Sequence, residues 1–262
     1  VMLTEMYPHL KGLPIPKKGG EINIEELIRI KADLIFVKDE TINNEAAMEK
    51  LRLAKIPVVA VEYASIEEQR YAMQMLAIIA GAEEEGQKYQ QFYEDTIAMV
   101  QARVAAIPDN ERVTVYHSSQ EATRTDTVNT LAAGWTRAAG VKNVSVGQDL
   151  KLSDGDHFAS LEQILLWNPD YILVNNPDVV GYIMGHEQWR PLQAVKNQRV
   201  LPLPVGISRW GHPNSLETPL VVVWTAKTVY PQLFDDVDMQ AIIHDFYARF
   251  FDMDLDQATM ER

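Results

Sequence analysis

One segment of this chain occurs twice. Residues 23–37 read NIEELIRIKADLIFV, and residues 160–174 read SLEQILLWNPDYILV. Asn23 and Ser160, each with Glu or Gln three residues later, form capping-box patterns that satisfy N–H groups of a first helical turn. The Asp and the continuous apolar run that follow are typical of a strand buried on both faces of a parallel sheet. The repeat therefore predicts two similar α/β lobes with a ligand cleft between them.

The chain between the copies predicts a single long helix. Residues 83–106 carry apolar side chains at helical spacing, and roughly 24 residues at 1.5 Å each span about 36 Å. Gly81 and Gly86 are expected to break the helical pattern that precedes it. We therefore predict two Rossmann-like lobes with parallel sheets, joined by one connecting helix. Their expected bounds are 1–82 for the first lobe, 83–107 for the helix and 108–262 for the second lobe.

Composition narrows the class of function. The chain has 262 residues, no cysteine and a net charge of −13. Missing cysteine removes disulfides, thiolate metal sites and cysteine nucleophiles, and the negative charge disfavours general attraction to nucleic acid. No apolar run approaches the ~20 residues of a membrane-spanning helix. Hydrolase, dinucleotide and P-loop signatures are also missing, so the sequence does not predict an enzyme.

Several further motifs occur in a characteristic order along nearly the whole chain. They are the repeated unit, the long helix, and the segments at residues 7–11, 135–144, 189–200 and 224–234. In this order they resemble the substrate-binding proteins of bacterial ABC importers for iron complexes and cobalamin. The resemblance implies a protein that binds its cargo without catalysis or cofactor, and partners that are a membrane permease dimer with its ATPase subunits. It also implies a periplasmic or lipoprotein-anchored location, with a signal sequence and one more strand and helix expected before Val1.

The loop at residues 207–219 has the composition of an anion site. It follows a predicted strand at 199–204, whose prolines favour a sheet edge. Its candidate ligand residues are Arg209, Trp210, His212, Asn214 and Ser215. Pro219 fits only the first turn of a helix, which predicts Ser215 or Thr218 as the cap and free N–H groups directed toward His212. Such a helix start favours an anion by ~0.3–1 kcal/mol. The alternative is a structural helix-entry loop.

A second polar loop follows the strand predicted at residues 112–116. Its candidate ligand residues are Tyr116, His117, Ser118 and Arg124, although loops of this composition are often solvated turns. Lys38 and residues 7–9 of the first lobe are weaker candidates. The six histidines of the chain show no i,i+4 pair, so no metal site is predicted.

Docking to the permease is implied by the resemblance alone. Family members present one acidic residue on each lobe to basic pockets of their permease. Glu45 matches the position in the first lobe, and Asp178 or Glu187 matches the position in the second. The alternative for each is a carboxylate that stabilises the start of its own helix.

The nature of the ligand stays open between several possibilities. The family has a molybdate- and tungstate-binding branch, and the loop at residues 207–219 favours it because its donors are mostly neutral. A ferric siderophore is larger and would use converging arginines, for which Arg124, Arg190 and Arg209 are available. Cobalamin or haem would use an aromatic groove, for which the chain offers Trp135, Trp189 and Trp210. A metallocofactor enzyme and a pure scaffold are the remaining alternatives.

Overall fold

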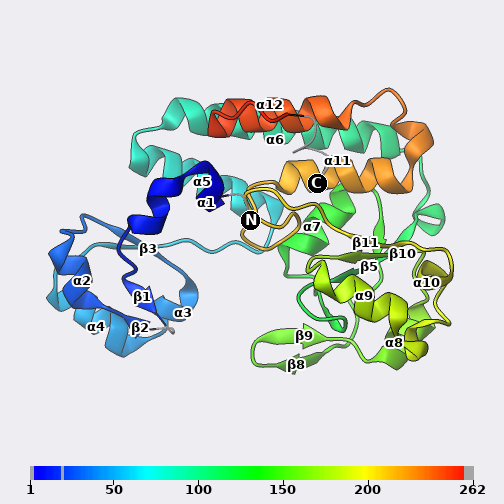
Figure 1. Cartoon of the computed structure of the whole chain (residues 1–262), viewed down its shortest axis with the longest axis horizontal. Helices are drawn as coiled ribbons and strands as arrows, with labels where there is room; N and C mark the ends of the chain where they lie inside the picture. The colour runs from blue at the N-terminus through cyan, green and yellow to red at the C-terminus, as the bar shows by residue number, and fades with distance from the viewer. Residues whose placement is uncertain (1–2, 19–20, 257–262) are drawn as a thin grey trace. The chain divides into compact units, whose positions relative to one another are not determined.

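The computed structural model describes residues 3–18 and 21–256. The chain divides into two compact units, residues 3–63 and the chain from residue 64 onward (Figure 1). Both units contain parallel strands and helices, which confirms the predicted α/β class. Within the described ranges, no helix is long and apolar enough to cross a membrane.

The smaller unit is built on a two-stranded parallel sheet. Strand β3 pairs in parallel with β4, and a short antiparallel pair is formed by β1 and β2. Its elements are α1 Leu3–Met6, the 3-10 helix η1 Pro8–Gly12, β1 Lys17–Lys18, β2 Glu21–Ile22, α2 Ile24–Arg29, β3 Ile35–Val37, α3 Asp39–Ile42, α4 Glu45–Leu53 and β4 Val58–Ala60. Leu27, Leu51 and Ile56 form its buried core.

The larger unit is built on a four-stranded parallel sheet in the order β11-β10-β5-β7. A second, antiparallel sheet has the order β6-β9-β8. Its helices are α5 Ile66–Ala80, α6 Glu83–Val104, α7 Leu131–Ala138, α8 Leu161–Trp167, α9 Asp178–Gly185, α10 Gln193–Lys196, α11 Thr218–Val229 and α12 Met239–Phe251, with 3-10 turns η2 Asp109–Glu111, η3 Glu187–Trp189 and η4 Pro231–Leu233. Its strands are β5 Thr114–Ser118, β6 Arg124–Thr125, β7 Lys142–Asn143, β8 Lys151–Ser153, β9 Asp156–Phe158, β10 Tyr171–Val174 and β11 Val200–Pro202. Strand β11 lies at the sheet edge, as its prolines predict.

Both copies of the repeat form a capped helix followed by a parallel strand, as predicted. The predicted capping box is complete for Ser160 and Gln163. In the first copy only half of it forms, because Asn23 accepts from the Glu26 N–H at 3.0 Å while the Glu26 carboxylate binds Arg29. Strand β10 is buried within its sheet, but β3 is not buried on both faces, because Phe36 is 48% exposed. The prediction of a doubly buried strand is therefore confirmed for the second copy and wrong for the first.

The long helix is present as α6, and it packs against α5 and α11. Gly81 ends α5 in the left-handed conformation, with φ of 65°, as expected. Gly86 does not break the helix and lies inside α6. A Cβ at this position would stand 2.4 Å from the Ala77 Cβ, so glycine lets α5 and α6 approach closely.

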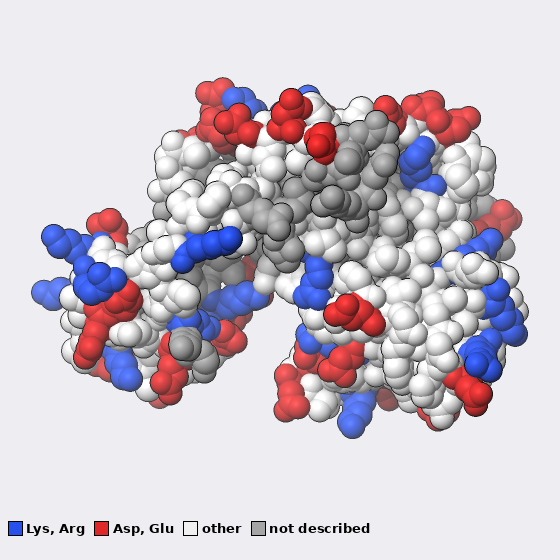
Figure 2. All heavy atoms as spheres, viewed as in Figure 1, with Lys and Arg blue, Asp and Glu red and all other residues white. Residues whose placement is uncertain are grey.

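The outer face of the larger unit is acidic. Figure 2 shows Asp and Glu side chains gathered along the side formed by α6 and α12. The first turn of α6 alone contributes Glu83, Glu84 and Glu85. Because the net charge of the chain is −13, the expected anionic ligand would have to be bound by local donors.

Candidate functional site

Three loops of the larger unit meet where strands β5, β10 and β11 end. The Arg209 Nη1 donates to the Gln120 side-chain oxygen at 3.0 Å, and the Asn176 amide donates to the Gln120 carbonyl at 3.3 Å. The Asn175 amide donates to the Trp210 carbonyl at 2.9 Å. The three loops are thus tied to one another by side-chain hydrogen bonds at the carboxyl edge of a parallel sheet, where ligands bind in α/β folds.

His117 lies near the end of strand β5, just before these loops, and it is 1% exposed. Its Nδ1 lies 2.7 Å from the Asp126 carboxylate, which also accepts from the Asn143 amide at 3.1 Å. This contact places the ring proton on Nδ1 in the neutral tautomer and makes Nε2 an acceptor. Nε2 has no hydrogen-bond partner among the described residues. The imidazole is therefore fixed in orientation and packs edge-on against Trp135, with ring centroids 5.3 Å apart.

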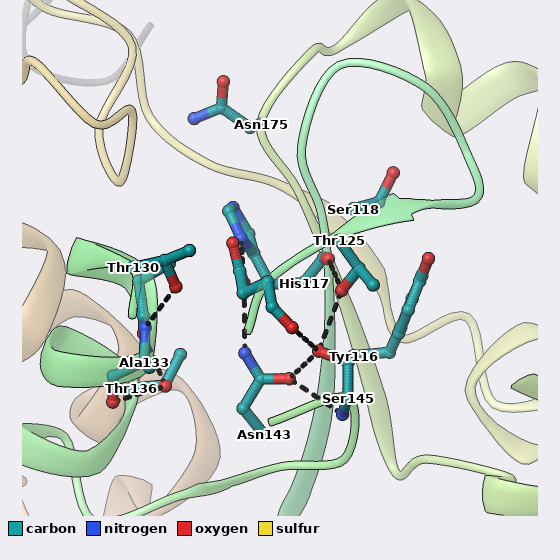
Figure 3. Close-up of polar contacts among 12 residues, drawn as sticks. Tyr116, His117, Ser118, Thr125, Thr130, Ala133, Thr136, Asn143, Ser145 and Asn175 are labelled. Atoms are coloured by element: carbon teal, nitrogen blue, oxygen red, sulfur yellow. Dashed lines mark hydrogen bonds and ion pairs between the residues drawn. The ribbon is translucent and has the colours of Figure 1, made fainter. Parts of the chain in front are cut away.

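A chain of hydroxyl and amide groups supports this histidine from below (Figure 3). The Thr125 hydroxyl donates to the His117 carbonyl at 2.8 Å and lies 2.9 Å from the Ser145 hydroxyl. Ser145 in turn lies 2.9 Å from the Asn143 side-chain oxygen. Because all these groups are buried, the network fixes β5, β6 and the chain after β7 relative to one another.

The other predicted residues of this loop have structural partners. Tyr116 and Ser118 are fully buried on the opposite face of β5, where they donate to the carbonyls of Ala122 and Glu121 at 3.1 and 3.0 Å. Burial raises the pKa of the Tyr116 hydroxyl far above its usual range, and the Asp126 charge adds to the increase. Arg124 forms an ion pair with Asp156 of β9. These three side chains stabilise the turn that follows β5.

The helix after the third loop begins between the two predicted positions. Helix α11 starts at Thr218 with Glu217 as its N-cap, so the prediction of Ser215 or Thr218 as the cap is wrong. The Ser215 hydroxyl instead accepts from the Glu217 N–H at 3.1 Å, and the Thr218 hydroxyl donates to the Ser215 carbonyl at 2.9 Å. A carboxylate of the chain itself therefore lies at the positive end of α11, where we expected an external anion.

The remaining predicted ligand residues lie together on the third loop. Trp210 is buried and contributes its carbonyl to Asn175, whereas Arg209 and His212 are partly exposed and Asn214 is exposed. The His212 Nδ1 accepts from the Asn214 N–H at 3.2 Å, which directs the ring proton to Nε2 in the neutral tautomer. The loop thus presents a guanidinium, an imidazole and an amide within six residues, all able to donate to an anion.

Four residues of this region were not predicted from the sequence. Gln120, Asn175 and Asn176 join the loops, and Glu217 is a fully buried carboxylate. The two asparagines directly follow the buried strand β10. Their position at the carboxyl edge of the sheet is the sequence signal that could have identified them as site residues. Glu217 gave no such signal, because a carboxylate before a helix is usually an exposed stabilising charge.

The predicted docking carboxylates are exposed at the starts of helices or turns. Glu45 is the first residue of α4, and Asp178 is the first residue of α9. Neither has an ion-pair partner within 4.0 Å in the described part of the chain, whereas Glu187 lies 3.6 Å from Arg190. Among these three, Glu45 and Asp178 keep an uncompensated charge.

A separate groove of about 340 Å³ lies beside α7. Its lining includes Ser65, Thr130, Asn143, Arg137 and Lys142. The hydroxyls of Ser65 and Thr130 already cap α5 and α7, and the Asn143 amide donates to Asp126, so these polar groups of the groove have structural roles.

Residues 3–18 and 21–256 contain no group of three or more His, Asp or Glu side chains placed to hold a metal ion.

The sequence and the fold are both similar to those of known proteins. Residues 16–205 match the family model of the periplasmic binding proteins. The molybdate-binding protein MolA of Haemophilus influenzae is 28% identical over 278 residues, which cover 95% of this chain and 75% of that protein. The structure of MolA bound to molybdate superposes with a TM-score of 0.84 at 24% identity, covering 97% of this chain and 83% of that one.

Two further solved structures share the fold. A periplasmic solute-binding protein from Veillonella parvula has a TM-score of 0.81 at 23% identity, covering 99% of this chain and 79% of that one. An ABC transporter solute-binding protein from Sulfurospirillum deleyianum has a TM-score of 0.77 at 24% identity, covering 95% and 78%. The family model spans well over half of the sequence, and the chain therefore belongs to the periplasmic binding protein family.

Proposed function

We propose that this protein captures a small tetrahedral oxyanion of the molybdate or tungstate type outside the cytoplasm and delivers it to the permease of an ABC importer. The proposal draws on membership of the periplasmic binding protein family and on the similarity to a molybdate-binding relative. Its ligand would be cargo, and the chain would need neither a catalytic group nor a resident cofactor.

One observation carries the choice of ligand: of the three arginines considered for ligand binding, only Arg209 lacks a carboxylate partner in the described ranges. Arg124 pairs with Asp156, and Arg190 pairs with Glu187. Arg209 donates instead to the neutral oxygen of Gln120. One uncompensated guanidinium with neutral amide and imidazole donors suits a small dianion, whereas a ferric siderophore would favour several converging arginines.

Delivery would use the two uncompensated carboxylates. Glu45 and Asp178 each begin a helix and project from the surface without an ion-pair partner within 4.0 Å in the described residues. Exposed charges of this kind accelerate and orient association with a basic surface and are weakened by salt. Basic pockets on a permease are the expected counterpart.

Calorimetric titration of the ligand-free protein tests the proposal. Molybdate and tungstate should release or absorb heat, with sulfate, phosphate and a ferric catecholate as competitors. Arg209→Gln should weaken binding by roughly 10- to 100-fold, because a hydrogen bond to a charged group contributes about 1.5–3 kcal/mol. Arg190→Gln is the matched control and should bind as the wild type does. Silence with both oxyanions together with binding of the iron chelate would overturn the proposal.

A further inference from the structure

Glu217 is buried completely, yet no arginine, lysine or histidine pairs with it among the described residues. Its Oε1 accepts from the Ser208 N–H at 3.2 Å and from the Tyr247 hydroxyl at 2.9 Å. Its Oε2 accepts from the hydroxyls of Ser208 at 2.6 Å and Ser215 at 2.9 Å. A buried carboxyl group is costly unless donors surround it, and here both of its oxygens are fully engaged by neutral donors.

The donors come from both ends of the candidate ligand loop. Ser208 stands directly before Arg209, and Ser215 stands directly after Asn214. Because one carboxyl group binds both serines, it closes the base of the loop that carries the guanidinium, the imidazole and the amide. The projecting part of the loop is also held by the Trp210 N–H on the Pro204 carbonyl, by the Asn175 amide on the Trp210 carbonyl and by the hydrogen bond from Arg209 to Gln120.

The close packing around Glu217 requires glycine at position 206. A Cβ on Gly206 would stand 1.8 Å from the Tyr247 hydroxyl and 2.5 Å from the Glu217 Oε1, so only glycine permits this approach. Burial raises the pKa of Tyr247 far above its usual range, and the neighbouring Glu217 raises it further. Tyr247 of α12 therefore stays protonated and remains a donor at any physiological pH.

Helices α5 and α6 hold the end of the same loop through its backbone. The buried Gln69 amide donates to the Ser215 carbonyl at 2.8 Å, and its own oxygen accepts from the Tyr93 hydroxyl at 2.9 Å. The Tyr89 hydroxyl donates to the Leu216 carbonyl at 2.9 Å. Together with Tyr247 of α12, these bonds anchor the Glu217 end of the loop to three helices of the larger unit, α5, α6 and α12.

From these contacts we infer that Glu217 is a positioning residue, which fixes the direction in which Arg209, His212 and Asn214 present their donors. Its effect on ligand affinity rests on the proposed function, but its effect on the order of the loop does not. A negative group beneath an anion-binding loop would oppose binding by charge alone. Its value therefore lies in the geometry it imposes.

Glutamine at this position separates geometry from charge. The Ser208 N–H can only donate, so the oxygen of the introduced amide would face the Ser208 nitrogen and the Tyr247 hydroxyl. The amide NH₂ would then face the hydroxyls of Ser208 and Ser215, which can rotate and accept. Glu217→Gln should therefore keep the loop closed, whereas Glu217→Ala removes all four hydrogen bonds of the carboxyl group.

The test combines hydrogen exchange at the loop amides with calorimetric titration of molybdate. In Glu217→Ala we expect loss of exchange protection at Trp210, His212 and Ser215 and a rise in the molybdate Kd of at least about tenfold. Glu217→Gln should keep both within about threefold of the wild type. Ile164→Ala, at a fully buried core position of α8, is the control for general destabilisation and should lower Tm while it leaves loop protection and Kd unchanged.

Three outcomes would contradict either the positioning role of Glu217 or the proposed function. Wild-type loop protection in Glu217→Ala, or an equal loss of affinity in Ile164→Ala, would overturn the positioning role. A wild-type protein that binds no oxyanion would overturn the proposed function, and the exchange data would still decide the role of Glu217. Should Glu217→Ala fail to fold, Tyr247→Phe removes one donor only and should give a smaller loss of protection at the same amides.

Discussion

The two copies of the repeat share a pattern but differ in what surrounds them. Strand β10 lies between β5 and β11 in the larger unit, and its Leu173 is fully buried. At the equivalent position of the first copy, Phe36 of β3 is 48% exposed, because β3 has only β4 beside it in the described sheet. Local sequence therefore sets the helix, the cap and the strand, while neighbouring strands set how much each apolar side chain contributes to stability.

The largest expected difference between the copies is at these two positions. Leu173→Ala should reduce the free energy of unfolding by about 3 kcal/mol, because it opens a cavity in a packed core. Phe36→Ala should cost about 1 kcal/mol or less, since about half of the residue is already exposed to water. Urea unfolding followed by circular dichroism measures both. Equal losses would mean that Phe36 is covered in solution.

The residues that follow the two strands provide the second contrast. The Asn175 amide donates to the buried Trp210 carbonyl after β10, whereas Lys38 after β3 is exposed and makes no side-chain capping bond. Asn175→Ala should cost about 2 kcal/mol, because a buried carbonyl loses its donor. It should also weaken molybdate binding, since the third loop loses a tie to β10. Lys38→Ala should leave stability and affinity as in the wild type, and a reversed order would refute the assignment of the site to this edge.

A smaller difference is expected at the aspartate that precedes each strand. The Asp170 Oδ2 accepts from the Thr114 N–H at 2.8 Å and from the Thr114 hydroxyl at 2.6 Å, which ties the start of β10 to β5. Asp33, by contrast, is an exposed residue before β3. Asp170→Ala should cost roughly 1.5 kcal/mol and Asp33→Ala close to none. Thermal unfolding of the two variants in parallel checks the contrast, and a matching drop in Tm for both would contradict it.

Much of the fold could be predicted because its signals are local. Asn23, Ser160 and Gly81 mark helix ends through side-chain and backbone chemistry that acts over three or four residues. Pro202 likewise placed β11 at an edge. The exposure of β3 could not be predicted, because it depends on how many strands flank β3 in the sheet. The apolar runs at residues 34–37 and 171–174 are similar and carry no information about these neighbours.

The candidate site could be predicted only in part, for a similar reason. The loops after β5 and β11 were identified from their composition, but the contacts that organise them join residues far apart in sequence, such as Arg209 with Gln120 and Tyr247 with Glu217. No local pattern records these pairs. The start of α11 was misplaced because Pro219 is compatible with every position of the first helical turn, and the buried network around Glu217 fixes the cap at that residue.

The smallest expected effect concerns position 26 and its equivalent 163, where one copy has a charged group and the other a neutral one. Glu26 forms two hydrogen bonds of 2.7 Å with Arg29, which hold the pKa of its carboxyl below the ordinary value of 4.5. Its contribution to stability is therefore fully present above the ordinary value and is lost as the pH falls through the lowered one. Gln163 bonds the Ser160 N–H without a titrating group, so the second copy should not respond. An NMR pH titration should show a depressed midpoint for Glu26 that returns toward 4.5 in Arg29→Gln. A midpoint unchanged by this substitution would mean that the exposed pair does not persist in water, and the two copies would then differ in burial alone.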